Sequence, residues 1–175
     1  MKIDANVVVS LEYTLSAHRT NEPETLVEQT DTEHPFVFLF GHHGVLPEFE
    51  KQLLGKTTQD SFDFYIPAED AYGQYDPEYH VSLEKHIFEV DGSFDSSRVF
   101  VGNRVEMNDA NGHPLDGLVT EITISHVKMD FNHPLAGQRL HFVGRVLELR
   151  NASEEELAHG HVHGPHGHHH YHAGF

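Results

Sequence analysis

The stretch Gly41-His42-His43-Gly44-Val45-Leu46-Pro47-Glu48-Phe49-Glu50 contains the start of a helix. Pro47 suits the first helical position, where its missing N–H is not needed, and the positive end of the helix dipole stabilises acidic side chains in the first turn. Gly55 is a residue type at which helices commonly end. Three apolar side chains share one face of this helix: Leu46, Phe49 and Leu53. We therefore expect one short helix that packs this face on a core.

Strand patterns lie on both sides of this helix. Apolar and polar residues alternate over residues 7–15, and we expect extended segments at 25–30, 36–40 and 57–66. Residues 138–150 carry apolar side chains in both phases of the alternation. That pattern is typical of a strand in the middle of a sheet.

Residues 76–130 form a separate segment with turns and strands of its own. Strand patterns occur at 99–101, 105–107 and 118–124, and Asn111-Gly112 is typical of a hairpin turn. We expect a small core here, made of Val99, Val101, Val105, Ile122 and Ile124. The chain is therefore predicted to have an α+β fold with an inserted β-rich domain.

The composition excludes several classes of protein. The 175-residue chain has a formal net charge of -17, so we expect no binding to nucleic acid or to an anionic membrane surface. It has no apolar run long enough for a transmembrane helix, and residues 1–6 lack the apolar core of a signal peptide. The absence of cysteine excludes disulfides and thiolate chemistry and fits a reducing compartment. We expect a cytoplasmic protein.

Three further stretches complete a pattern: Ala71-Tyr72-Gly73-Gln74-Tyr75-Asp76, Asn132-His133-Pro134-Leu135-Ala136-Gly137-Gln138 and Glu154-Glu155-Glu156-Leu157-Ala158-His159-Gly160-His161-Val162-His163-Gly164. Together with the helix stretch, they resemble the SlyD-type FKBP peptidyl-prolyl cis-trans isomerases over nearly the whole chain. The resemblance implies an FKBP-like, half-open antiparallel sheet around one short helix, formed by residues 1–75 and 131–152. It also implies an insert-in-flap chaperone domain at 76–130, and a short helix with a disordered His-rich tail at 153–175.

The resemblance implies an isomerase pocket as well. The residues carried over as catalytic are Tyr72, Phe142 and Glu28, and those carried over as substrate-binding are Tyr13, Val27, Phe36, Val45, Leu46 and Phe49. The family usually has Asp where this chain has Glu28, and its eukaryotic members often have Trp where it has Phe49, which leaves the substrate preference open. Without the resemblance, the phenylalanines are interpreted as ordinary core residues.

Such a reaction needs no nucleophile, metal or other cofactor, because rotation about an Xaa–Pro bond breaks no covalent bond. The barrier of about 18–20 kcal/mol is the loss of amide resonance. A dry apolar pocket favours the twisted, less polar amide over the planar forms. Tyr72 is expected to donate a hydrogen bond to a substrate carbonyl, and Phe142 and Phe49 to enclose the proline ring.

In that family the inserted domain binds unfolded chains through exposed apolar surface. The residues expected to form this surface are Ile87, Phe88 and Phe94. The alternative is that these side chains belong to the small core of the domain itself.

The end of the chain is rich in histidine. Ser153 and Glu156 have capping-box spacing, so we expect a short helix at about 154–158. Eight imidazoles follow as candidate metal ligands: His159, His161, His163, His166, His168, His169, His170 and His172. Nickel is the expected metal, with zinc, copper or cobalt as alternatives. The other interpretations are a purification tag, a solvated tail without metal, and a group of charges that responds to pH.

Three functions remain open from the sequence. The first is a prolyl isomerase with chaperone and nickel-binding activities, acting on unfolded or nascent proline-containing polypeptides as a monomer. The second is a nickel store or delivery factor for metalloenzyme assembly, such as hydrogenase maturation, with a weak or vestigial isomerase pocket and maturation factors as partners. The third is a chaperone that only holds unfolded chains.

Overall fold

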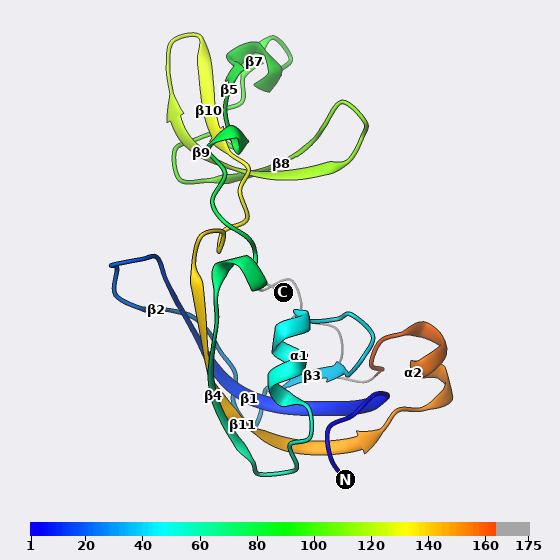
Figure 1. The fold of residues 1–175 in the computed structure, drawn as a ribbon. Helices are drawn as coiled ribbons and strands as arrows, with labels where there is room; N and C mark the ends of the chain where they lie inside the picture. The colour runs from blue at the N-terminus through cyan, green and yellow to red at the C-terminus, as the bar shows by residue number, and fades with distance from the viewer. Residues whose placement is uncertain (164–175) are drawn as a thin grey trace. The chain divides into compact units, whose positions relative to one another are not determined.

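The structure, a computed structural model, describes residues 1–163. Two compact units divide the chain (Figure 1). Unit 1 contains Met1–Gln74 and the chain from Leu135 onward, and unit 2 is Tyr75–Pro134. Strands outweigh helices in both units, which agrees with the predicted α+β class and its few helices. No helix in the described part of the chain is long and apolar enough to cross a bilayer.

Unit 1 is built on an antiparallel sheet in the order β2-β1-β11-β4, with β3 also paired to β1. Its strands are β1 (Val7–His18), β2 (Thr25–Gln29), β3 (Phe36–Leu39), β4 (Ser61–Ile66) and β11 (Arg139–Asn151). The strand expected to start at residue 57 starts only at Ser61. Residues 57–60 form a turn, because the Asp60 carboxylate accepts a hydrogen bond from the Thr57 N–H at 2.9 Å.

The helix α1 (Pro47–Leu53) lies against one face of this sheet (Figure 1). Its Phe49 and Leu53 are fully buried in the same core as alternate residues of β1 and β11. The helix starts at Pro47 as predicted, and Gly55 follows its end with φ +84°, a conformation that only glycine adopts without strain. Local sequence signals therefore determine both ends of α1.

The two apolar phases of β11 have a structural cause. Leu11 pairs with Val146 and Ser10 pairs with Glu148, so Leu147 is the extra residue of a bulge. A bulge shifts the phase of the alternation along a strand. Residues before it, such as Phe142, and Leu149 after it therefore reach the same core. The central place predicted for this strand is confirmed, since β11 lies between β1 and β4.

Unit 2 has a four-stranded antiparallel sheet in the order β5-β10-β9-β8 and a small hairpin. The sheet strands are β5 (His80–Glu84), β8 (Arg104–Asn108), β9 (Pro114–Ile122) and β10 (His126–Asp130). The hairpin strands are β6 (Glu89–Val90) and β7 (Ser93–Phe94), and the 3₁₀ turns are η2 (Pro77–Tyr79) and η3 (Lys85–Phe88). Six buried side chains form its core: Phe88, Val99, Val105, Val119, Val127 and Met129.

Two of the core residues expected in unit 2 are exposed instead. Val101 is 60% exposed and Ile124 is 98% exposed. Val99 and Val101 do not form a strand, because the Val99 N–H bonds back to the Asp95 carbonyl at 3.0 Å in a turn. Ile124 lies in the turn between β9 and β10, where alternation no longer reports which side chain faces the core.

The last described segment of unit 1 is the helix α2 (Glu154–His159) with the turn that follows it. The capping box predicted for Ser153 and Glu156 is present. Residues 159–163, expected to be the start of a disordered tail, pack on unit 1 instead: Val162 is 4% exposed and contacts Val8 and Leu39. The rest of the predicted tail, 164–175, lies outside the described residues.

Candidate functional site

Four of the predicted pocket residues form one aromatic cluster in unit 1. Tyr13 on β1, Phe36 on β3, Phe49 on α1 and Phe142 on β11 are each at most 2% exposed. The ring centroids of Phe49 and Phe142 lie 4.8 Å apart, and those of Tyr13 and Phe142 lie 5.6 Å apart. These distances are typical of edge-to-face and offset ring pairs. We call these four residues the ring cluster.

Two phenylalanines that the predicted set omits extend the ring cluster. Phe38 stacks on Phe36 at 5.4 Å, and Phe64 stacks on Phe142 at 5.6 Å. The sequence did carry a signal for both. Residues two apart in a strand point to the same face, so Phe38 follows from Phe36, and Phe64 belongs to the alternating residues of β4.

Glu28 lies at the edge of the ring cluster. The Tyr13 hydroxyl donates a hydrogen bond to its carboxylate, with 2.6 Å between Oη and Oε2. A bulge positions this part of β2: Glu28 pairs with Leu15 and Leu26 pairs with Ser16. Val27, also predicted to bind substrate, is the extra residue of this bulge and is 38% exposed.

Tyr72 is held beside the ring cluster by a tight loop. The loop follows β4 and contains the 3₁₀ turn η1 (Ala68–Asp70). Gly73 has φ +76°; its N–H donates to the Ala68 carbonyl at 2.8 Å, and its own carbonyl accepts from the Gly137 N–H at 2.7 Å. These contacts fix the backbone next to Tyr72, whose partly buried side chain packs on the core that contains the rings.

The two phenols remain hydrogen-bond donors. Burial raises the pKa of Tyr13, and the hydrogen bond to Glu28 raises it further. Burial also raises the pKa of Tyr72, with a smaller contribution from the charge of Glu28. Both hydroxyls therefore keep their protons well above neutral pH.

The remaining predicted pocket residues lie at the start of α1. Val45 is buried in the same core, and Leu46 is partly buried and packs against it. The site thus combines a buried aromatic cluster, phenolic donors and one carboxylate already engaged by Tyr13. Such groups suit an apolar ring with a neutral amide better than a charged substrate.

On the opposite face of β11, His141 joins β11 to two other parts of unit 1. Its Nδ1 lies 3.1 Å from the Glu24 carboxylate and its Nε2 lies 2.7 Å from Asp63 Oδ1. Its ring also stacks on Tyr65 at 4.0 Å. Burial lowers the pKa of His141, but the hydrogen bonds and charges of Asp63 and Glu24 together outweigh it, so the pKa is raised.

His141→Gln should therefore destabilise the protein in a pH-dependent way. A histidine whose pKa is raised in the folded state stabilises the folded protein. This stabilisation is complete at pH values below the unfolded pKa of about 6.5, and it is lost as the pH rises through the folded pKa. We expect the variant to lower Tm by a few degrees at pH 6 and by less at pH 9. Tm is measured by calorimetry. The control variant is His34→Gln, because His34 also lies beside a carboxylate, that of Asp31, but is exposed. Equal losses at both pH values would contradict the ion-pair role of His141.

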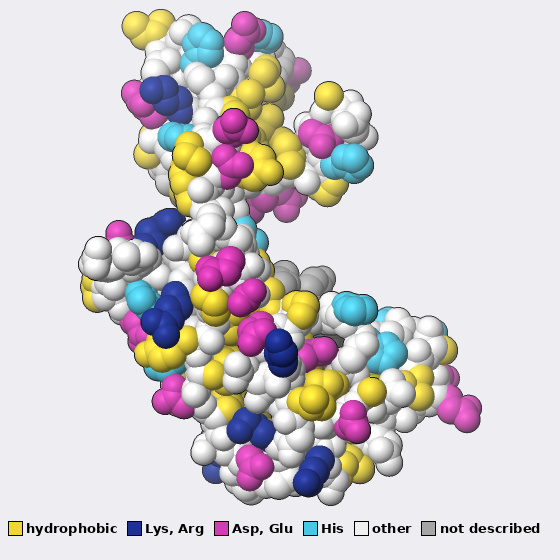
Figure 2. All heavy atoms as spheres, viewed as in Figure 1, with side chains coloured by type: hydrophobic (Ala, Val, Ile, Leu, Met, Phe, Trp, Pro, Cys, Tyr) yellow, Lys and Arg dark blue, Asp and Glu magenta, His cyan; other side chains and the backbone are white. Residues whose placement is uncertain are grey.

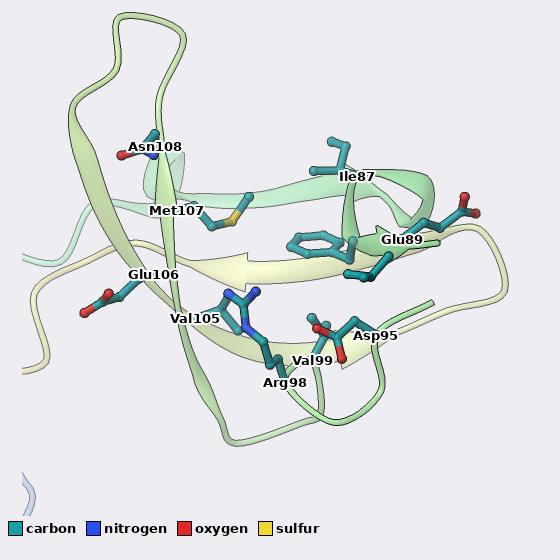
Figure 3. Close-up of a pocket in the computed structure, with 11 residues that line it drawn as sticks. Ile87, Glu89, Asp95, Arg98, Val99, Val105, Glu106, Met107 and Asn108 are labelled. Atoms are coloured by element: carbon teal, nitrogen blue, oxygen red, sulfur yellow. The ribbon is translucent and has the colours of Figure 1, made fainter. Parts of the chain in front are cut away.

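Unit 2 has a hollow of about 360 Å³ that both apolar and polar side chains line (Figure 3). Its apolar lining consists of Ile87, Phe88, Val90, Val99, Val105 and Met107. The other lining residues are mostly acidic, with Arg98 as a single cation, and Figure 2 shows acidic and apolar side chains intermixed on the visible face of unit 2. This hollow is a candidate site for apolar side chains of another chain.

The three residues expected to bind unfolded chains differ in exposure. Ile87 is 50% exposed at the hollow, as expected. Phe94 is partly buried and packs against the core of unit 2. Phe88 is only 8% exposed and belongs to that core, so the expectation that it is exposed is wrong. Its 3₁₀ turn directs it inward, while its neighbour Ile87 faces outward.

A candidate metal site lies at the last residue of α2 and in the turn that follows it. The ligand atoms of His159, His161 and His163 all lie within 4.8 Å of one another. Neutral imidazoles are good ligands for nickel, zinc, copper and cobalt, so this donor set suits such a metal. Five other predicted ligands, His166, His168, His169, His170 and His172, lie outside the described residues.

Comparison with known proteins places these features in a family. Residues 1–92 match the family model described as FKBP-type peptidyl-prolyl cis-trans isomerase. The chain is 40% identical over 166 residues to a protein of Escherichia coli (strain K12) named FKBP-type peptidyl-prolyl cis-trans isomerase SlyD, covering 95% of this chain and 80% of the relative. A protein of the same name from Haemophilus influenzae is 38% identical over 167 residues, covering 95% and 82% of the two chains.

Proposed function

Since the chain belongs to the FKBP-type peptidyl-prolyl cis-trans isomerases and is an enzyme of that class, we propose that its ring cluster, Tyr72 and Glu28 form the catalytic site. The observation that carries this proposal is the convergence of rings from β1, β3, α1 and β11 beside a phenol fixed by the Gly73 loop. The substrates are proline-containing polypeptides.

In this site, catalysis follows from polarity and shape. As the Xaa–Pro amide twists, the carbonyl loses part of its negative charge and the nitrogen regains its lone pair, so the twisted amide is less polar than the planar one. Phe142 and Phe49 offer it an apolar environment, which favours the transition state over both planar ground states. Tyr72 donates a hydrogen bond to a substrate carbonyl and so orients the peptide.

Glu28 has a positioning role in this account. Its carboxylate accepts the Tyr13 hydroxyl at 2.6 Å, which fixes the Tyr13 ring among its neighbours. Because no proton is transferred in isomerisation, neither Glu28 nor a phenol acts as an acid or base. No cofactor is required for the reaction.

Tyr72→Phe tests the hydrogen bond directly. The variant keeps the ring and removes one donor, a loss of about 1 kcal/mol, so kcat/KM for an Xaa–Pro peptide should fall about fivefold. The matched control is Tyr65→Phe, which removes a hydroxyl from an exposed residue of β4 and should leave the rate unchanged. An unchanged rate for Tyr72→Phe would remove Tyr72 from the catalytic site.

Unit 2 is proposed to be an insert-in-flap chaperone domain that binds unfolded chains. The support is the hollow of unit 2, where two lining residues expose apolar side chains: Ile87 is 50% exposed and Val90 is 55% exposed. The acidic side chains among its lining favour client segments in which apolar residues stand beside Lys or Arg.

The imidazoles from His159 onward are proposed to bind nickel or a similar divalent metal. The support is the cluster of His159, His161 and His163, whose donors match the ligand preference of nickel. This cluster also supports the alternative function proposed from the sequence, which is metal delivery during metalloenzyme maturation with maturation factors as partners. A monomer in the cytoplasm remains a prediction of the sequence.

A further inference from the structure

The carboxylate of Glu156 is a buried hub at the end of unit 1. Its side chain is 3% exposed. Its two oxygens accept hydrogen bonds from Arg150 Nη1 at 2.8 Å and Nη2 at 2.9 Å, from the Ser153 N–H at 2.9 Å and from the His163 N–H at 2.9 Å. A buried charge persists only where it is paired and hydrogen-bonded, and a forked Arg–carboxylate pair is a strong form of such pairing. The donors come from β11, the cap of α2 and the segment after α2.

The bond to His163 closes the segment after α2 back onto the helix. Gly160, with φ +73°, makes the turn, and its N–H donates to the Glu156 carbonyl at 2.8 Å. Val162 then inserts into a small cluster with Val8 of β1 and Leu39 of β3. The segment is thus attached at two points, through a backbone N–H at His163 and through an apolar side chain at Val162.

These attachments determine where the imidazoles lie. Val162 is buried against Val8 and Leu39, whereas the ligand atoms of His159, His161 and His163 all lie within 4.8 Å of one another. The ring centroids of His159, His161 and His163 are 5.0 to 5.6 Å from one another. Zinc or nickel bound at about 2.0–2.1 Å to each nitrogen needs only small side-chain movements from this arrangement.

We propose that Arg150 and Glu156 are positioning residues for a three-imidazole metal site that is part of folded unit 1. This inference rests on the proposed metal binding. It adds that one metal site is formed by His159, His161 and His163, and that Arg150 and Glu156 hold these ligands in place. Since the three imidazoles converge only when β11, α2 and the Val162 cluster are in place, metal binding there is linked to folding. Metal at this site therefore stabilises unit 1 by mass action.

The experiment uses the full-length chain with the later ligands His166, His168, His169, His170 and His172 replaced by Gln. In this background, Glu156→Gln keeps the shape of the side chain and removes its charge. Supporting interactions around metal ligands typically contribute 10- to 100-fold in affinity, so we expect Zn²⁺ affinity, measured by competition with a chelating dye, to fall at least about tenfold. Arg150→Lys keeps the charge, loses the fork and should give an intermediate loss.

Two matched variants separate positioning from general loss of stability. Glu154→Gln removes the same charge from an exposed position on the same helix and should change the affinity less than about twofold. Phe62→Ala lowers stability through the core of unit 1 without touching the hub, and at a temperature where it remains folded its Zn²⁺ affinity should be unchanged. The absorption bands of saturating Co²⁺ should be the same in the background and in Glu156→Gln, because the ligands are the same.

The outcomes distinguish this inference from the proposed metal binding. A background protein that binds no Zn²⁺ overturns both. Binding that Glu156→Gln leaves unchanged, or that Phe62→Ala weakens equally, overturns the positioning role alone. The inference is supported by selective loss in Glu156→Gln together with a Zn²⁺-induced rise in Tm that His161→Gln abolishes.

Discussion

Replacing Phe142 with alanine is expected to lower kcat/KM for an Xaa–Pro peptide by about 10- to 100-fold. The ring lies 4.8 Å from Phe49 and 5.6 Å from Tyr13, in the middle of the ring cluster. Its removal takes away an apolar wall worth about 1.5–3 kcal/mol of contact with the substrate proline. The measurement is peptide isomerisation followed at several enzyme concentrations, at a temperature where circular dichroism shows the variant folded.

The control for Phe142→Ala is Phe62→Ala. Both rings are buried in the same core, and either substitution should lower stability by about 3–5 kcal/mol. Phe62 lies outside the ring cluster, so its variant should keep nearly normal kcat/KM while folded. If the two variants lost activity equally, Phe142 would act through stability alone, and its assignment to the catalytic site would be wrong.

Removing unit 2 is expected to abolish the suppression of client aggregation and to leave the rate of isomerisation of short peptides unchanged. The deletion joins residue 75 to residue 131 by a short flexible linker. The proposed hollow for unfolded chains belongs to unit 2, whereas every residue of the ring cluster belongs to unit 1. Light scattering of an aggregating client reports the first activity, and a proline tetrapeptide assay reports the second.

A point variant gives the same test without a deletion. Ile87→Ser together with Val90→Ser removes half-exposed apolar side chains from the hollow and should greatly weaken client binding. Ile124→Ser is the matched control, because Ile124 is 98% exposed in the turn after β9 and is not one of the residues that line the hollow. Full aggregation suppression by the deleted protein, or equal loss in Ile124→Ser, would contradict the assignment.

Much of unit 1 follows from local sequence signals. Pro47 and Gly55 bound α1, and the alternation of apolar residues locates β1 and β4. These signals act through backbone geometry over a few residues, so one sequence is enough to detect them. The convergence of Tyr72 and Phe142 is different, since the two lie far apart in the chain, and only the resemblance to a family placed them together in advance.

The errors arise where exposure depends on contacts between distant segments. Val101 and Ile124 continue an apolar alternation, yet they lie in turns that the sheet of unit 2 leaves in solvent. Phe88 is a large apolar residue of the kind that binds unfolded chains, but its side chain is buried in the core of unit 2. The folded turn at His159–His163 was missed because it depends on Val162 reaching Val8 and Leu39, and composition alone indicates a disordered tail there.

The most direct test of the catalytic site is exchange NMR of a short Xaa–Pro peptide with substoichiometric full-length protein labelled on its aromatic side chains. The account predicts faster cis–trans exchange of the peptide, together with shift changes concentrated on Tyr13, Phe36, Phe49, Tyr72 and Phe142. Accelerated exchange without a response from these rings, or contact with them without acceleration, would contradict it.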